Sequence, residues 1–165
     1  MYGRKLVEVN MGRIIAVANQ KGGVGKTTTT INLSACLAEQ GQKVLVIDVD
    51  PQGNTTSGLG IDKNNTENTV YELMLGEASI DDCIYKSVMD DLDVIPSNVN
   101  LAGAEIDLID IDDREYILKK IVNSLKEKYD FILLDCPPSL SMLTVNAMTA
   151  ANTCLLYTSP SPRDA

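Results

Sequence analysis

A segment rich in glycine and lysine, K-G-G-V-G-K-T-T-T at residues 21–29, carries the most specific chemistry in this sequence. It lies between an apolar run at residues 13–19 and an alanine- and leucine-containing run at 32–39, which predict a buried strand and a helix. Glycines allow the backbone to curl with its N–H groups pointing inward, and the start of a helix adds positive potential at the same point. We therefore expect this turn to bind a phosphate group rather than to be an ordinary glycine-rich connection.

The end of the segment extends this prediction to a nucleoside triphosphate with Mg²⁺. Its spacing predicts that Lys26 reaches the β- and γ-phosphates and that the Thr27 hydroxyl ligates the metal. The general phosphate loop would have glycine at position 20, where this chain has Gln20, and a second lysine, Lys21, follows. The spacing alone leaves Lys21 open between a solvated lysine and a lysine with a role in phosphate chemistry.

Aspartates at the ends of two apolar runs are the second candidate part of the site. Asp48 and Asp50 close the run at 43–48, and Asp135 closes the run at 131–135. Ligands of parallel α/β sheets bind at the carboxyl ends of the strands, so we expect these carboxylates to converge on the phosphate loop. Mg²⁺ prefers such oxygen ligands, directly or through water. A lone strand-end aspartate is more often a turn or cap residue, but two of them after a phosphate loop favour the site. Cys136, beside Asp135, is expected to be a packing residue.

Strand and helix patterns alternate along the chain, which predicts an α/β fold with a mainly parallel sheet covered by helices on both faces. The expected strands are residues 13–19, 43–48, 92–96 and 131–135, and the expected helices are 26–39, 69–75, 101–109, 114–128 and 143–151. Residues 54–68 are expected to form a loop, and the acidic stretch 105–115 a solvated loop or face.

Composition excludes several classes of protein. The 165 residues carry a net charge of −9, so this chain lacks the basic footprint of a nucleic-acid-binding surface. Four cysteines without a C-x-x-C pair, and the absence of histidine, argue against an iron–sulfur or zinc site. Buried thiols in a reducing cytoplasm are the better account of the cysteines.

Together these motifs resemble the ParA/Soj-type chromosome-partitioning ATPases of the deviant Walker A (ParA/MinD) group. The resemblance rests on N-Q-K-G-G-V-G-K-T-T-T at 19–29, D-V-D-P-Q-G-N at 48–54, S-G-L-G at 57–60, V-I-P at 94–96, L-A-G-A-E at 101–105 and D-C-P-P-S-L at 135–140. It implies a doubly wound fold similar to P-loop NTPases, truncated at the C-terminus. It also implies a cytoplasmic, nucleoid-associated ATPase that uses ATP and Mg²⁺.

The resemblance implies a role for each site residue. Lys26 would serve the nucleotide of its own subunit, Lys21 would reach the phosphates of a dimer partner, and Asp50 would orient or activate the attacking water. The implied nucleotide-binding residues are Lys21, Gly22, Gly23, Val24, Gly25, Lys26, Thr27 and Thr28; the implied metal site is Thr27, Asp48 and Asp135; and the implied catalytic residues are Lys21, Lys26 and Asp50.

The implied partners are a second copy of the protein, bound on ATP binding, a ParB-type protein that stimulates hydrolysis, and non-specific DNA. The DNA contacts would lie in a missing C-terminal portion, and no membrane partner is expected. A MinD-like membrane-associated positioning ATPase shares the same phosphate chemistry and is the alternative, and an inactive truncated fragment is another.

The two ends of the chain are expected to be foreign to the domain. Residues 1–10 read as an upstream extension from a miscalled start, with Met11 as the start of the protein. Residues 154–165 read as a sequencing-adapter tail, which leaves residues 11–153 as the N-terminal portion of the ATPase domain.

Overall fold

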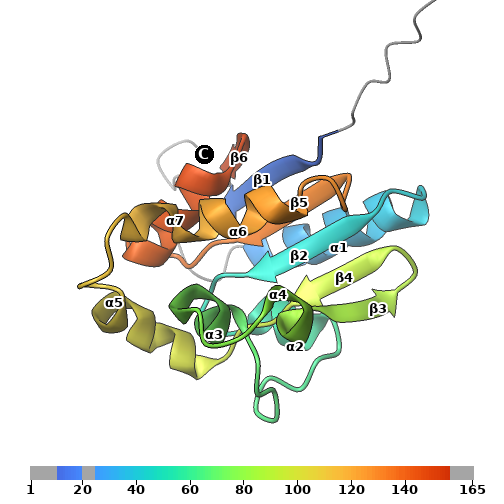
Figure 1. Cartoon of the computed structure of the whole chain (residues 1–165). Coiled ribbons are helices and arrows are strands. Elements are labelled where there is room, and N and C mark those ends of the chain that lie inside the picture. The colour runs from blue at the N-terminus through green and yellow to red at the C-terminus, as the bar shows by residue number, and fades with distance from the viewer. Residues whose placement is uncertain (1–10, 20–24, 157–165) are drawn as a thin grey trace, which may run out of the picture.

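A computed structural model describes residues 11–19 and 25–156, which form a six-stranded sheet with helices on both faces (Figure 1). The strands are β1 (Arg13–Ala18), β2 (Val44–Asp48), β3 (Tyr85–Met89), β4 (Leu92–Ile95), β5 (Phe131–Asp135) and β6 (Thr153–Leu156). Their order across the sheet is β3-β4-β2-β5-β1-β6, and every neighbouring pair is parallel except β3 with β4. The predicted doubly wound, mainly parallel α/β fold is confirmed.

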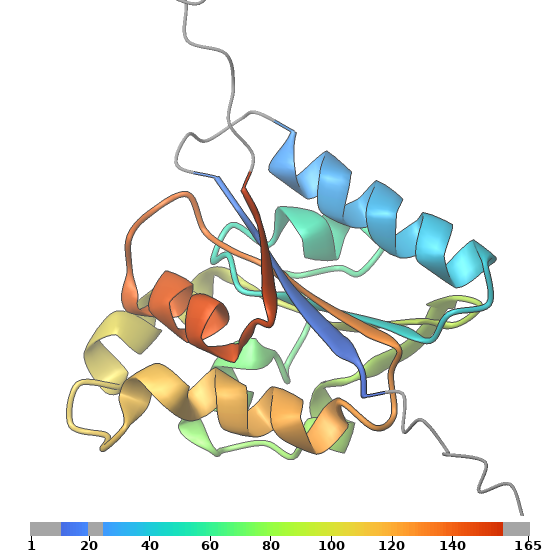
Figure 2. The ribbon, with the colours of Figure 1, turned by 90° about the horizontal axis from the view of Figure 1, so that it is seen from above.

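The helices divide between the two faces of the sheet (Figure 2). The α-helices are α1 (Lys26–Glu39), α2 (Asn54–Gly58), α3 (Val70–Leu75), α4 (Ile80–Cys83), α5 (Ala104–Asp107), α6 (Ile117–Leu125) and α7 (Met142–Ala150); short 3₁₀ turns are η1 (Val99–Gly103) and η2 (Arg114–Tyr116). Helix α1 lies on one face, and α6 and α7 lie on the other. None of the helices in the described residues is both long enough and apolar enough to cross a membrane.

Alternation along the central strands explains why both faces are covered. In β5, Ile132 and Leu134 belong to the apolar cluster beneath α6 and α7, whereas Leu133 belongs to the cluster beneath α1. Successive side chains of a strand point to opposite faces, so a strand that is apolar throughout needs a cover on each side. Burial on both faces therefore fixes β5, with its terminal Asp135, in the middle of the sheet.

Several segments differ from their predicted structure. Residues 54–58 form α2 where a loop was predicted, and β3 pairs antiparallel with β4 through a turn in which Asp91 has a φ of 60°. The predicted helix 114–128 is divided into η2 and α6. The acidic stretch 105–115 is mostly exposed, as predicted, but Leu108 within it is fully buried.

Three of the four residues of strand β6 lie inside the segment predicted to be an adapter tail, residues 154–165. Cys154, Leu155 and Leu156 continue a parallel pairing with β1 that begins at Thr153. Its four residues are all exposed. The short strand therefore extends the sheet at the β1 edge.

A buried asparagine joins α6 to α7 and gives a test of this packing. Asn146 is fully buried; its Oδ1 accepts from the Leu118 N–H at 3.1 Å, and its Nδ2 donates to the carbonyls of Arg114 and Met142 at 2.9 and 3.1 Å. Asn146→Ala is expected to lower the free energy of unfolding by about 1–3 kcal/mol, because it leaves buried backbone groups unpaired. Urea denaturation beside the exposed-site control Val145→Ala measures this; equal midpoints for the two variants would contradict it.

Candidate functional site

Lys26 begins α1 at the point where the glycine-rich segment ends. Gly25, just before it, has a φ of 84°, a left-handed conformation that glycine adopts without steric cost. The Lys26 side chain is turned inward and is only 8% exposed. Its ammonium donates a hydrogen bond to Asp135 Oδ1 and lies 3.9 Å from Asp50 Oδ2. The structure thus joins the predicted phosphate-binding lysine to two of the three predicted carboxylates.

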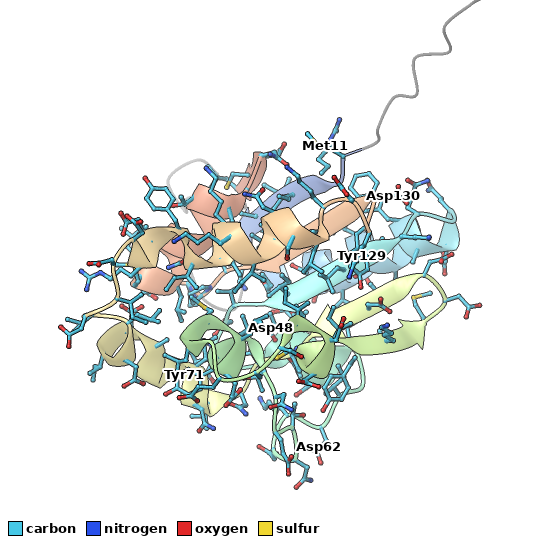
Figure 3. All side chains as sticks on the ribbon, viewed as in Figure 1. Met11, Asp48, Asp62, Tyr71, Tyr129 and Asp130 are labelled. Atoms are coloured by element: carbon cyan, nitrogen blue, oxygen red, sulfur yellow. The ribbon has the colours of Figure 1, made fainter. Side chains whose placement is uncertain are left out.

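The three carboxylates gather at the carboxyl ends of two neighbouring strands. Asp48 and Asp135 occupy matching positions on β2 and β5, and Asp50 follows two residues after Asp48. All three are buried: Asp48 is 0%, Asp135 1% and Asp50 7% exposed. Figure 3 shows Asp48 within the molecule, in contrast to Asp62 at its outer margin. The predicted convergence at this edge of the sheet is therefore present.

The other predicted residues divide into two groups. Thr27 is half-buried and Thr28 exposed, both in the first turn of α1 beside Lys26. Lys21, Gly22, Gly23 and Val24 lie outside the described residues. Their roles remain predictions.

Burial raises the affinity of two of these carboxylates for protons. Desolvation, with a further contribution from the charge of Asp135, raises the pKa of Asp48 to about 7, although hydrogen bonds from Thr56 and Asp50 oppose the shift. Desolvation also raises the pKa of Asp135, against the opposing effects of the Lys26 ammonium and the Thr55 hydroxyl. Both shifts arise mainly because burial disfavours the charged form of the carboxyl group, and for Asp135 this holds although the Lys26 ammonium lies beside it.

Asp50 differs from its neighbours because one of its oxygens is held by the local backbone. Its Oδ1 accepts a hydrogen bond from the Gln52 N–H at 2.9 Å, and its backbone carbonyl accepts from the Ser97 hydroxyl at 2.8 Å. Oδ2 is the oxygen nearer Lys26. The carboxylate is thus fixed with one oxygen directed towards the lysine.

Two threonines of α2 belong to the site and were not predicted from the sequence. Thr55 donates a hydrogen bond to Asp135 Oδ2, and Thr56 donates to Asp48 Oδ2 from both its hydroxyl, at 2.7 Å, and its backbone N–H, at 2.9 Å. Both threonines are fully buried. The sequence places these two threonines shortly after Asp48 and Asp50, but their role in the site could be predicted only if residues 54–58 were known to form a helix.

The donor set fits Mg²⁺ held together with a nucleotide. Asp48, Asp135 and the Thr27 hydroxyl supply hard oxygen atoms, and the described residues contain no cluster of three or more acidic, histidine or cysteine side chains arranged to hold a metal. Mg²⁺ is usually bound by one or two carboxylates plus substrate phosphates, so it needs no cage made by protein alone. Cys136 is buried, and desolvation raises its pKa to about 12, so its thiol stays protonated, as expected of a packing residue.

Two curated proteins illustrate the chain's relatives. It is 52% identical over 146 residues to the sporulation initiation inhibitor protein Soj of Bacillus subtilis, covering 88% of this chain and 58% of that protein. It is 47% identical over 146 residues to the chromosome partitioning protein ParA of Myxococcus xanthus, covering 88% and 52%. The chain therefore spans little more than half the length of these relatives.

A solved structure shares the fold of this chain. Cobyrinic acid a,c-diamide synthase from Mycobacterium smegmatis, with bound ADP and magnesium, superposes with a TM-score of 0.84 at 43% identity, covering 88% of this chain and 59% of that one. The resemblance to Soj and ParA predicted from the motifs is thus confirmed. Because the AAA domain family AAA_31 matches residues 12–163, the chain belongs to that family, and within it the chain is similar to the Soj and ParA partitioning proteins.

Proposed function

We propose that this chain is part of a Mg²⁺-dependent ATPase of the ParA/Soj type that acts in chromosome or plasmid partitioning. The observation that carries the proposal is the contact of Lys26, at the start of α1, with Asp135 and Asp50 at the carboxyl edge of the sheet. A cation after a glycine-rich turn, opposite strand-end carboxylates, is the arrangement that phosphoryl transfer to water requires. The similarity to Soj and ParA supports partitioning as the process.

Lys26 is proposed to exchange partners when ATP binds. In this structure the Lys26 ammonium donates a hydrogen bond to Asp135, and the side chain is largely shielded from water at the start of α1. Phosphate oxygens would replace the Asp135 oxygen as its acceptor. Asp135 and Asp48, with Thr27, would then hold Mg²⁺, which supplies charge neutralisation of the phosphates when bound.

Asp50 is proposed to orient the attacking water. Its Oδ1 is occupied by the Gln52 N–H, so Oδ2 is the oxygen available to accept a hydrogen bond from a water molecule. A carboxylate in this position accepts a proton or a hydrogen bond from the nucleophile as it attacks.

An apolar surface beside the site supports the proposed ATP-dependent dimer. Leu140, in the loop after β5, is 90% exposed, and it borders a cavity of about 310 Å³ with Ala18, Pro138 and Met148. Exposed apolar patches of this kind mark interaction sites. The cavity lies at the end of β1, where Ala18 and Asn19 line it.

Removing Lys21 is expected to separate ATP binding from dimerisation. Lys21→Ala in the full-length protein should bind ATP as a monomer but fail to dimerise, because the phosphates that Lys21 is proposed to contact belong to the partner subunit. Light scattering with ATP and Mg²⁺ measures this, with Lys120→Ala, an exposed lysine of α6, as the control. An undiminished dimer would assign Lys21 to its own subunit or to the solvent.

The remaining parts of the proposal concern the whole protein. Residues 11–153 are proposed to be the N-terminal portion of the ATPase domain, with 1–10 and 154–165 foreign to it. The dimer would bind DNA non-specifically through the portion beyond this chain and would be stimulated by a ParB-type partner. Its place would be the cytoplasm, on the nucleoid.

A further inference from the structure

Helix α2 presents two neighbouring threonines to two different carboxylates. Thr55 donates to Asp135 Oδ2, on β5, whereas Thr56 donates to Asp48 Oδ2, on β2. Successive residues of a helix are turned by about 100° from one another, so one short helix reaches both strands. The backbone N–H of Thr56 adds a second bond to Asp48 at 2.9 Å. Two adjacent hydroxyls therefore each donate a hydrogen bond to one oxygen of a predicted metal-site carboxylate.

The hydroxyl of Thr56 is engaged on both sides. It donates to Asp48 and also accepts a hydrogen bond from the Ser97 N–H at 2.9 Å, while the Ser97 hydroxyl donates to the carbonyl of Asp50 at 2.8 Å. A hydroxyl combines one donor with two acceptor positions, which a methyl group cannot replace. The ends of β2 and β4 and the start of α2 are thus connected through this one oxygen.

The two carboxylates differ in which of their oxygen atoms accept hydrogen bonds from the protein. Thr55 occupies Asp135 Oδ2, so Oδ1 is the oxygen that meets Lys26. Asp48 has Oδ2 bonded to Thr56 and Oδ1 bonded to the Asp50 N–H at 3.1 Å. The terminal torsion of aspartate is otherwise soft, and the two buried carboxylates lie on adjacent strands where their charges repel. Lys26 and the Thr30 hydroxyl, at 3.5 Å, also donate to Asp135 Oδ1, and two backbone N–H groups donate to Asp48. The hydroxyls of Thr55 and Thr56 therefore complete the set of donors that fixes each carboxylate.

We propose that Thr55 and Thr56 are positioning residues that hold Asp135 and Asp48 in the orientations that bind the divalent cation. The inference rests on the proposed function, because it concerns the same cation. Hydrogen-bond partners of metal-binding carboxylates typically change metal affinity or activity by 10- to 100-fold when removed. Among the described residues, the Thr55 hydroxyl bonds to the Asp135 carboxylate alone, so Thr55 tests the role most simply.

The test uses Mn²⁺ as a paramagnetic substitute for Mg²⁺. Mn²⁺ binding to the full-length protein with ADP is measured by electron paramagnetic resonance for Thr55→Val and Thr56→Val, which keep the side-chain shape but lose the hydroxyl. Thr55→Ser and Thr56→Ser restore the hydroxyl. The matched control is Thr66→Val, a buried threonine whose hydroxyl bonds to the Asp62 carbonyl at 2.7 Å. ADP binding in EDTA and thermal unfolding without nucleotide are recorded for every variant.

The valine variants are expected to bind Mn²⁺ about 10- to 100-fold more weakly. The serine variants and Thr66→Val should bind it like the parent, and ADP binding in EDTA should be unchanged throughout. Parental Mn²⁺ affinity in both valine variants, serine variants as defective as the valine variants, or unfolding of both valine variants would overturn the proposal. A parent that binds neither ADP nor Mn²⁺ would instead overturn the proposed function itself.

Discussion

Lys26→Ala in the full-length protein is expected to weaken ATP binding severely. The variant removes the ammonium that is bonded to Asp135 and is proposed to bind the phosphates when ATP enters. Because Lys26 is only 8% exposed, water cannot easily supply the lost interaction with the phosphates. Truncating one member of a buried, hydrogen-bonded charge pair costs about 2–5 kcal/mol. That cost corresponds to a rise in the Kd for ATP of roughly 30-fold to more than 1,000-fold. Calorimetric titration with ATP and Mg²⁺ measures it.

The controls for Lys26 separate binding from folding. Lys26→Met keeps most of the aliphatic stem and should lose ATP binding equally, while Lys120→Ala, at an exposed position on α6, should bind like the parent. Both variants remove the Lys26 ammonium, which leaves the buried Asp135 without its ion-pair partner. A lower melting temperature is therefore expected in both Lys26 variants. Retention of parental ATP affinity in folded Lys26→Met would refute the assignment of this lysine to the phosphates.

Asp50→Ala is expected to stop turnover and to leave ATP binding and dimerisation intact. The variant removes the oxygen proposed to orient the attacking water, a contribution worth about 100- to 10,000-fold in rate. A group used only in the transition state lowers kcat without weakening the ground-state complex. Phosphate release should therefore be lost in this variant, while the Kd for ATP and the light scattering with ATP should match those of the parent.

Two companion variants sharpen the Asp50 result. Asp50→Asn keeps an oxygen that can accept from the Gln52 N–H, so it preserves the local turn and should be as inactive as Asp50→Ala. Asp112→Ala, at an exposed position in the acidic stretch, should hydrolyse ATP at the parental rate. ATP hydrolysis at the parental rate by Asp50→Ala would show that the water is oriented by another group.

Residues that belong to a clear local sequence pattern could be predicted from the sequence alone. Strand β5 is apolar at every position before Asp135, and α1 starts at Lys26 as its spacing predicts. Because β1 and β5 are parallel neighbours, Lys26, which follows β1, and Asp135, which ends β5, are expected at the same edge of the sheet, where ligands bind. Local chemistry and sheet geometry agree here, so sequence alone was sufficient.

Helix α2 shows where sequence alone is not sufficient. Threonine is a weak helix former, and residues 54–58 carry glycine, asparagine and serine, so their composition favours a loop. The helix is stabilised instead by bonds from Thr55 and Thr56 to carboxylates on two strands, one of them 80 residues away in sequence. Contacts of that kind do not appear in any local pattern. The same holds for Ser97, which enters the site only through its bonds to Thr56 and Asp50.

ATP turnover by the full-length protein with and without DNA and the ParB-type protein of its own locus tests the central claim most directly. Phosphate release is measured with Mg²⁺ for the parent alone, with non-specific DNA, with the ParB-type protein, and with both. A partitioning ATPase of this type should turn over slowly alone and be stimulated most when both are present, and Asp50→Ala should remain inactive in every condition. Absence of hydrolysis in all four conditions, or hydrolysis indifferent to both additions, would contradict the account.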